Sequence, residues 1–269
     1  MDRKFFLGIA VAVAIVFFGA ACAQSLMKHP APTVDHETLY QVSTIDALMQ
    51  GVYGGVQQFS EVRRHGDFGI GTFDALDGEM VALDGMYYQV RADGIAYPVP
   101  DAMTTPFATV TFFEPDLRIT TDGPMNYSVL STYLSDRIPS QNMVYAVRIN
   151  GTFPAMKVRS VPIQAPPYLP LTAAVANQTV FVYSGAKGTV VGFFMPKFFS
   201  ALNVPGYHLH FISEDRKSGG HILDMTTGAG ITAELDITPN FAMSLPTRGA
   251  FAGADLSHNL TADLAKVER

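Results

Sequence analysis

Cysteine is nearly absent from the sequence: Cys22 is the only one among 269 residues. A mature chain that begins at Gln24 therefore contains none. This excludes disulfide bonds within the mature chain, and it also excludes thiol nucleophiles and thiolate metal ligands. Any metal ion must then be bound by histidine nitrogen and carboxylate oxygen.

Positive charge is also scarce, with 18 Lys and Arg against 24 Asp and Glu and a net charge of −6. Binding to nucleic acid requires clustered Lys and Arg that neutralise phosphates. The one basic pair, Arg63-Arg64, is predicted to be solvated surface. We therefore expect no nucleic-acid partner.

The only long apolar run, Phe5–Ala23, follows a charged start and ends in small residues before Gln24. This pattern predicts a signal peptide over residues 1–23, cleaved after Ala23, and hence export to the periplasm or the exterior. Two alternatives stay open: Cys22 takes a lipid, or the run is kept as a membrane anchor. The polar, proline-containing residues 24–38 predict a linker.

Beyond the linker, turn signals and short apolar runs predict a β-rich chain. The pairs Asp77-Gly78, Asp84-Gly85 and Asp93-Gly94 indicate short hairpins in an antiparallel meander. Helices are expected after Thr44, over Tyr127–Asp136, and over Leu256–Glu268 with Asp255 as cap. Further strands are expected over 107–113, 178–183, 189–195, 207–212, 221–225, 231–236 and 241–245.

A long hairpin is predicted from Met143–Asn150 and Thr152–Arg159, with Gly151 at its turn. The proline-rich segment Pro162–Pro170 cannot form an interior strand. It predicts a boundary between an N-terminal part, residues 39–165, and a C-terminal part, residues 166–269.

Three of the seven histidines lie close together in GYHLHFISEDRKSGGHILD, residues 206–224. His208 and His210 share a face of a strand because side chains alternate along it. Glu214–Gly220 predicts a hairpin loop, and His221 joins that face only if an even-numbered residue lies opposite it. Closed in this way, the hairpin would bind one metal ion through three imidazoles and leave other coordination positions open. Zinc is favoured, with manganese or iron as substitutes.

Two charged residues outside this segment are candidates for the same site. Glu79 directly follows the Asp77-Gly78 turn, where its carboxylate is placed to act as metal ligand or as acid and base. Arg159 offers a planar fork of donors that suits a substrate carboxylate. On the residues alone, a surface position is the more common outcome for each.

Four long strings closely resemble the alpha-acetolactate decarboxylase family. They are LYQVSTIDALMQGVYGG (39–55), GDFGIGTFDALDGEM (66–80), PSQNMVYAVRINGTF (139–153) and GYHLHFISEDRKSGGHILD (206–224). The resemblance runs from about Leu39 to the C-terminus. It implies an α/β, β-rich fold with an N-terminal mixed sheet with helices, a C-terminal antiparallel barrel-like part, and an active site in the cleft between them. It also implies a homodimer.

The resemblance further implies zinc-dependent (Zn2+) conversion of 2-acetolactate to (R)-acetoin and CO2 through a metal-stabilised enediolate. The implied site residues are the zinc ligands His208, His210 and His221, together with Thr72, Glu79, Arg159 and the tail residue Glu268. Either glutamate would protonate the carbon, while Arg159 would bind the carboxylate and Thr72 would add a hydrogen bond. Asp263 is a second acidic residue in the tail, and no motif fixes the register there.

The histidine hairpin also fits two other interpretations. One is a cupin-like metal-dependent oxygenase or hydrolase that uses the same HxH hairpin. The other is a non-enzymatic periplasmic protein that binds metal. Oxygen-independent formation of acetoin from acetolactate would separate the decarboxylase from both.

Overall fold

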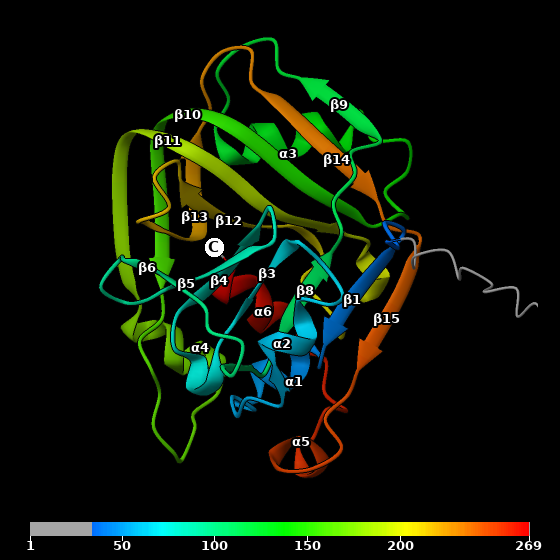
Figure 1. The fold of residues 1–269 in the computed structure, drawn as a ribbon, viewed down its shortest axis with the longest axis vertical. Helices are drawn as coiled ribbons and strands as arrows, with labels where there is room; N and C mark the ends of the chain where they lie inside the picture. The colour runs from blue at the N-terminus through cyan, green and yellow to red at the C-terminus, as the bar shows by residue number, and fades with distance from the viewer. Residues whose placement is uncertain (1–33, 269) are drawn as a thin grey trace, which may run out of the picture. The chain divides into compact units, whose positions relative to one another are not determined.

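Strands dominate the computed structural model, which describes residues 34–268 (Figure 1). Residues from Val34 onward cluster into one compact unit. The predicted signal peptide and residues 24–33 of the predicted linker lie outside the described residues. The linker prediction ends at 38, whereas Thr38 already begins the first strand. Within residues 34–268, no helix is long and apolar enough to cross a membrane.

The first sheet has seven strands in the order β15-β1-β8-β3-β4-β5-β6. It is mixed, as predicted, because β1 and β15 run parallel while the other neighbours are antiparallel. Asp84-Gly85 forms the predicted two-residue turn between β4 and β5. The strands are β1 (Thr38–Val42), β3 (Phe68–Thr72), β4 (Glu79–Leu83), β5 (Met86–Val90), β6 (Ala96–Pro98), β8 (Ala108–Thr111) and β15 (Asn240–Ser244).

The second sheet has six antiparallel strands in the order β11-β12-β13-β10-β14-β9. Since β10 also pairs with β11, four strands close into a ring, which is the predicted barrel-like part. Figure 1 shows β10 and β11 running side by side along most of their length. The strands are β9 (Leu117–Thr120), β10 (Tyr145–Ser160), β11 (Thr179–Met195), β12 (Gly206–Ser213), β13 (Gly219–Thr226) and β14 (Thr232–Ile237); β2 (Gln57–Gln58) and β7 (Thr104–Thr105) form a separate ribbon.

The helices are short. Thr44 caps α1 as predicted, since its hydroxyl accepts a hydrogen bond from the Ala47 N–H at 3.2 Å. The predicted helix after residue 126 is confirmed as α3, capped by Asn126. The helices are α1 (Ile45–Met49), α2 (Phe59–Val62), α3 (Tyr127–Ser135), α4 (Leu171–Ala174), α5 (Ala250–Gly253) and α6 (Thr261–Val267), with 3-10 turns η1 (Asp74–Leu76), η2 (Val175–Asn177) and η3 (Lys197–Phe199).

The predicted hairpin about Gly151 is wrong, because β10 continues through this residue as one strand. Gly151 lies directly opposite Gly188 of β11, so the Asn150-Gly151 pair is extended backbone inside a ladder. The strands expected at 178–183 and 189–195 are likewise one strand, β11. Continuous pairing with a long partner has overridden the local turn signals.

The predicted tail helix over 256–268 is also wrong in its extent. The Asp255 carboxylate accepts hydrogen bonds from the N–H and the hydroxyl of Ser257, at 3.0 and 2.6 Å, and so forms a turn. A short α5 precedes this turn, and α6 begins only at Thr261.

The two sheets face each other across an apolar layer. Phe68 and Val81 of the mixed sheet and Phe193 and Ile212 of the second sheet belong to one buried cluster there. A second cluster fills the barrel interior with odd-numbered side chains of β10 such as Tyr145 and Val147. The boundary after residue 165 stays a prediction, although each sheet contains strands from both sides of it.

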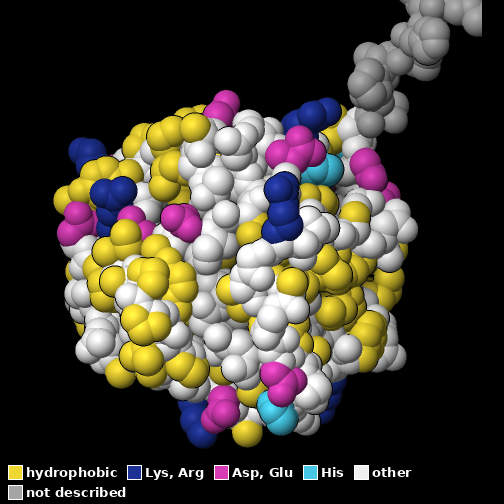
Figure 2. All heavy atoms as spheres, turned by 90° about the horizontal axis from the view of Figure 1, so that it is seen from below, with side chains coloured by type: hydrophobic (Ala, Val, Ile, Leu, Met, Phe, Trp, Pro, Cys, Tyr) yellow, Lys and Arg dark blue, Asp and Glu magenta, His cyan; other side chains and the backbone are white. Residues whose placement is uncertain are grey.

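Charged side chains on the surface include ion pairs such as Arg64–Glu61 and Lys266–Asp263. Figure 2 shows one face on which apolar side chains gather in broad areas and Lys and Arg side chains lie apart from one another. No basic patch appears on this face, in keeping with the net charge of −6.

Candidate functional site

The three predicted histidines meet on one face of the β12–β13 hairpin. His210 lies directly opposite His221 in the ladder, which satisfies the condition of an even-numbered partner. The loop closes where the Ser213 N–H donates to the Ser218 carbonyl. The ring centroids of His208, His210 and His221 are 5.0 to 5.3 Å apart.

This face lies outside the barrel, against β4 of the mixed sheet. Leu209 and Phe211, which alternate with the histidines, point into the barrel core. The Nδ1 atom of His210 is 2.8 Å from the Met80 carbonyl on β4. Because that carbonyl can only accept, Nδ1 carries the proton and Nε2 of His210 is left as a buried nitrogen without a partner.

The histidine geometry fits a divalent metal ion. One nitrogen from each ring lies within 4.8 Å of the others, and all three side chains are buried. Burial and, to a smaller extent, the positive charge of Arg159 together lower the pKa of His208 to about 3. Burial also holds the pKa values of His210 and His221 well below the usual range. The imidazoles are therefore neutral, which is the form that binds metal.

Glu79 is positioned by the turn that precedes β4. Gly78 has φ +88°, and a Cβ there would lie 2.3 Å from the Val90 carbonyl, so glycine is required. Thr72 donates its hydroxyl to the Gly78 carbonyl at 2.7 Å and pairs with Glu79 across the ladder. Glu79 thereby points its Oε2 toward Nε2 of His210, 3.8 Å away.

Arg159, at the end of β10, reaches the site because of a register shift. The pairing of β10 with β13 slips by one residue between Lys157 and Val158, which places Arg159 opposite His221. Its side chain is only 5% exposed, and Nε lies 3.9 Å from Oε1 of Glu79. The Nη1 atom donates to Oε1 of Gln178 at 3.2 Å.

Glu268 enters the site from the tail. It follows α6, whose Leu264 and Val267 are buried in the cluster shared with α1 and α4. One carboxylate oxygen lies 3.6 Å from Nε2 of His208 and 3.8 Å from Nε2 of His221. The other tail acid, Asp263, instead forms an ion pair with Lys266 on the surface.

The two glutamates are buried acids of similar strength. Burial raises the pKa of Glu79 to about 7, while Arg159 opposes the shift and Glu268 adds to it. Burial raises the pKa of Glu268 to about 7 as well, again opposed by Arg159. Near neutral pH, each side chain can therefore hold a proton or release it.

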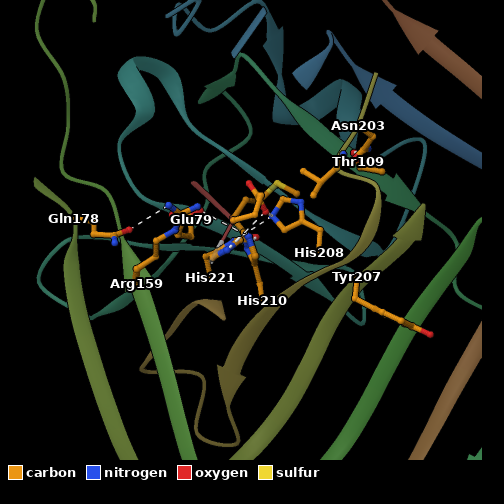
Figure 3. A network of polar contacts seen from close by, with 12 residues as sticks. Glu79, Thr109, Arg159, Gln178, Asn203, Tyr207, His208, His210 and His221 are labelled. Carbon is orange, nitrogen blue, oxygen red and sulfur yellow. Dashed lines mark hydrogen bonds and ion pairs between the residues drawn. The ribbon is translucent and has the colours of Figure 1, made fainter. Parts of the chain in front are cut away.

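All seven predicted site residues line one cavity. Figure 3 shows five of them, Glu79, Arg159 and the three histidines, lying together. Their roles remain predictions, although the structure brings them together. The cavity also has an apolar part of its lining that was not predicted; it consists of Ile45, Leu48, Leu76, Phe107, Val161 and Leu171. These residues come from α1, η1, α4 and positions next to β8 and β10, so no single local pattern marks them. Gln178 was not predicted as a site residue either, because no local sequence pattern marks it.

Comparison with known proteins identifies the family of the chain. The family model described as alpha-acetolactate decarboxylase matches residues 39–258. The chain belongs to the alpha-acetolactate decarboxylase family. The resemblance found in the sequence is thereby confirmed, and the family is one of carboxy-lyases. Glu268 lies beyond the matched residues.

Relatives in this family match along most of their length. The chain is 54% identical over 233 residues to an alpha-acetolactate decarboxylase of Methanosarcina mazei, covering 87% of this chain and 81% of the relative. It is 44% identical over 231 residues to the alpha-acetolactate decarboxylase of Methylococcus capsulatus, covering 86% of this chain and 88% of the relative. The crystal structure of the Bacillus subtilis alpha-acetolactate decarboxylase superposes with a TM-score of 0.83 at 39% identity, covering 86% of this chain and 98% of that one.

Proposed function

We propose that this protein decarboxylates 2-acetolactate to (R)-acetoin and CO2, using a zinc ion held by His208, His210 and His221. Membership of the alpha-acetolactate decarboxylase family supports the reaction. The observation that carries the proposal is the buried cavity that joins three neutral imidazoles to an arginine and two protonatable carboxyl groups.

Arg159 would bind and orient the substrate carboxylate. Its guanidinium is buried, and its Nε has no hydrogen-bond partner. Burying a cation with unpaired donors is costly unless a ligand supplies acceptors. A carboxylate of the substrate supplies two oxygens in a geometry that matches the guanidinium fork.

The bond between the carboxylate carbon and the hydroxyl-bearing carbon would then break, with release of CO2. The electron pair passes into the adjacent ketone. His208, His210 and His221 would hold the zinc ion, which would supply a Lewis acid that stabilises the negative charge developing on the former ketone oxygen. Glu79 or Glu268 would deliver a proton to the carbon from one side, which fixes the handedness of acetoin. Thr72 holds the turn that aims Glu79 and adds a hydrogen-bond acceptor to the cavity wall.

The test is an anaerobic incubation of the purified protein with racemic 2-acetolactate. We expect acetoin and CO2 to form in equal amounts without O2. A requirement for O2 would support the cupin-like oxygenase, and no reaction would support a metal-binding protein without catalytic activity. Family membership favours neither alternative.

We also propose that the protein is exported, as the N-terminal run Phe5–Ala23 supports. Acetolactate leaking from cells or supplied from outside would be its substrate there. Cell fractionation with N-terminal sequencing tests this, and a cytoplasmic protein that retains Met1 would contradict it. The homodimer is proposed from the family resemblance, and light scattering of the purified protein tests it.

A further inference from the structure

Gln178 makes the one side-chain hydrogen bond that the described chain gives to the Arg159 guanidinium. It lies where η2 ends and β11 begins, and its own N–H donates to the Val175 carbonyl at 3.0 Å. The backbone that carries the amide is thereby fixed. Figure 3 shows Gln178, Arg159, Glu79 and the histidines as one succession of polar groups.

We propose that Gln178 is a positioning residue that turns the Arg159 guanidinium so that its free donors face the substrate carboxylate. This proposal rests on the proposed function of the site. Oε1 of Gln178 accepts a hydrogen bond from Nη1 of Arg159 at 3.2 Å. The Nε atom of Arg159 has no hydrogen-bond partner and lies 3.9 Å from Oε1 of Glu79. An acceptor bound to one nitrogen of the guanidinium restricts rotation about the last bonds of the arginine side chain.

The amide side chain of Gln178 is suited to orienting Arg159 because it carries no charge. A carboxylate at the same position would accept the same hydrogen bond but would also form an ion pair with Arg159. Glu79 already places one carboxylate beside the guanidinium. A second carboxylate would give the guanidinium two acidic neighbours and weaken its attraction for the substrate, whereas glutamine orients the cation without adding a negative charge.

The effect of substitutions at Gln178 on ligand binding distinguishes a positioning role from a structural one. If Gln178 only satisfied a buried donor, Gln178→Met would lower thermal stability and would leave the preference for the carboxylate probe unchanged. If it orients the guanidinium, Gln178→Met, which fills similar space without an acceptor, must weaken binding of carboxylates. Gln178→Glu must weaken it as well, because it adds a negative charge beside Arg159.

The experiment measures ligand binding by calorimetry on the full-length, zinc-loaded protein with two probes. One is 2-hydroxyisobutyrate, which carries a carboxylate and a tertiary hydroxyl. The other is 3-hydroxy-3-methyl-2-butanone, which has the hydroxyl and a ketone but no carboxylate. The variants are Gln178→Glu and Gln178→Met, and the control is Asn177→Met at the adjacent exposed position. Zinc content and thermal unfolding confirm that each variant is folded.

We expect both Gln178 variants to bind 2-hydroxyisobutyrate about 10-fold more weakly. The carboxylate-free probe should bind as it does to the unsubstituted protein, and Asn177→Met should change neither. In the decarboxylase assay, KM should rise more than kcat falls. Unchanged carboxylate binding in Gln178→Met or Gln178→Glu, equal weakening of both probes, or failure of the unsubstituted protein to prefer the carboxylate would overturn the proposal. If the protein forms no acetoin, the proposed function fails, but the comparison of probes still decides the role of Gln178.

Discussion

His210 and His221 lie directly opposite each other on β12 and β13. His208 shares their face because it is two residues from His210, so one hairpin supplies all three imidazoles. The His210 ring is fixed further by the Met80 carbonyl of the other sheet, 2.8 Å from its Nδ1. The candidate site is thus built on strands of two sheets, which hold side chains more precisely than loops do.

The two glutamates should differ in their effect on zinc affinity. A Glu268 oxygen lies near two of the histidines, whereas Glu79 lies near His210 and Arg159. We expect Glu268→Gln to weaken zinc binding about 10- to 100-fold. Glu79→Gln should retain zinc and lose turnover. Competition with a fluorescent chelator measures both affinities, and equal affinities in the two variants would contradict this assignment.

Arg159→Ala should keep its zinc and lose decarboxylation. Removing a buried charge that binds a carboxylate costs about 2–5 kcal/mol, so kcat/KM should fall by roughly 30- to 4000-fold. Arg159→Lys should recover only part of this loss, because an ammonium cannot form the two-pronged contact. Steady-state kinetics on zinc-loaded protein tests both variants. Full turnover with an unchanged KM would remove Arg159 from the site.

The tail helix is expected to move when substrate enters. The cavity volume of about 40 Å³ has room for only a few water molecules and is too small for a five-carbon acid. Helix α6 is attached chiefly through Leu264 and Val267. Leu264→Ala should destabilise the seated helix by about 2–5 kcal/mol, speed amide hydrogen exchange over 261–268, and weaken zinc binding by displacing Glu268.

The matched control for this prediction is Lys266→Ala, because the Lys266 side chain is 72% exposed on the same helix. It should leave amide exchange and zinc affinity unchanged. Protection of 261–268 that is identical in Leu264→Ala and in the unsubstituted protein would show that Leu264 does not hold the tail.

A buried acid outside the site should govern how stability depends on pH. Asp236 on β14 is 2% exposed, and burial raises its pKa from 3.8 to about 8, with Asp116, Glu37 and Glu114 adding to the shift and the Glu114 N–H opposing it. The stability that the protonated group contributes is complete below pH 4 and is lost as pH rises to 8.

Asp236→Asn keeps the acceptor for the Glu114 N–H and removes the titration. We expect its Tm to exceed that of the unsubstituted protein by about 3 °C or more at pH 8.5, and by less at pH 5. Asp224→Asn, at an exposed position of β13, serves as the control. A Tm difference that is the same at both pH values would show that Asp236 does not titrate in this range.

The sequence predicts the grouping of the three histidines well because the geometry there is local. Alternation along a strand places His208 and His210 together, and a short loop carries His221 back to them. The Asp77-Gly78 turn likewise marks the place of Glu79. These relationships span few residues, so they depend little on the rest of the fold.

What the sequence could not predict depends on distant partners. Asn150-Gly151 looks like a hairpin turn, yet Gly151 pairs with Gly188 inside a long ladder. Arg159 faces the histidines only because the β10–β13 register slips by one residue, and Gln178 reaches Arg159 from another strand. Arg159 was a candidate from its own chemistry and from the family resemblance, and Glu268 from the resemblance alone, whereas no local pattern could have named Gln178.

The most direct measurement is a zinc titration of chelator-treated protein, with acetoin formation followed at each addition. Activity should be absent without metal and should saturate at about one zinc per chain. His210→Ala should bind no zinc and stay more than about 100-fold less active, while His258→Ala, at an exposed position, should match the unsubstituted protein. Full activity in zinc-free protein, or in zinc-free His210→Ala, would contradict a reaction that depends on metal held by these three histidines.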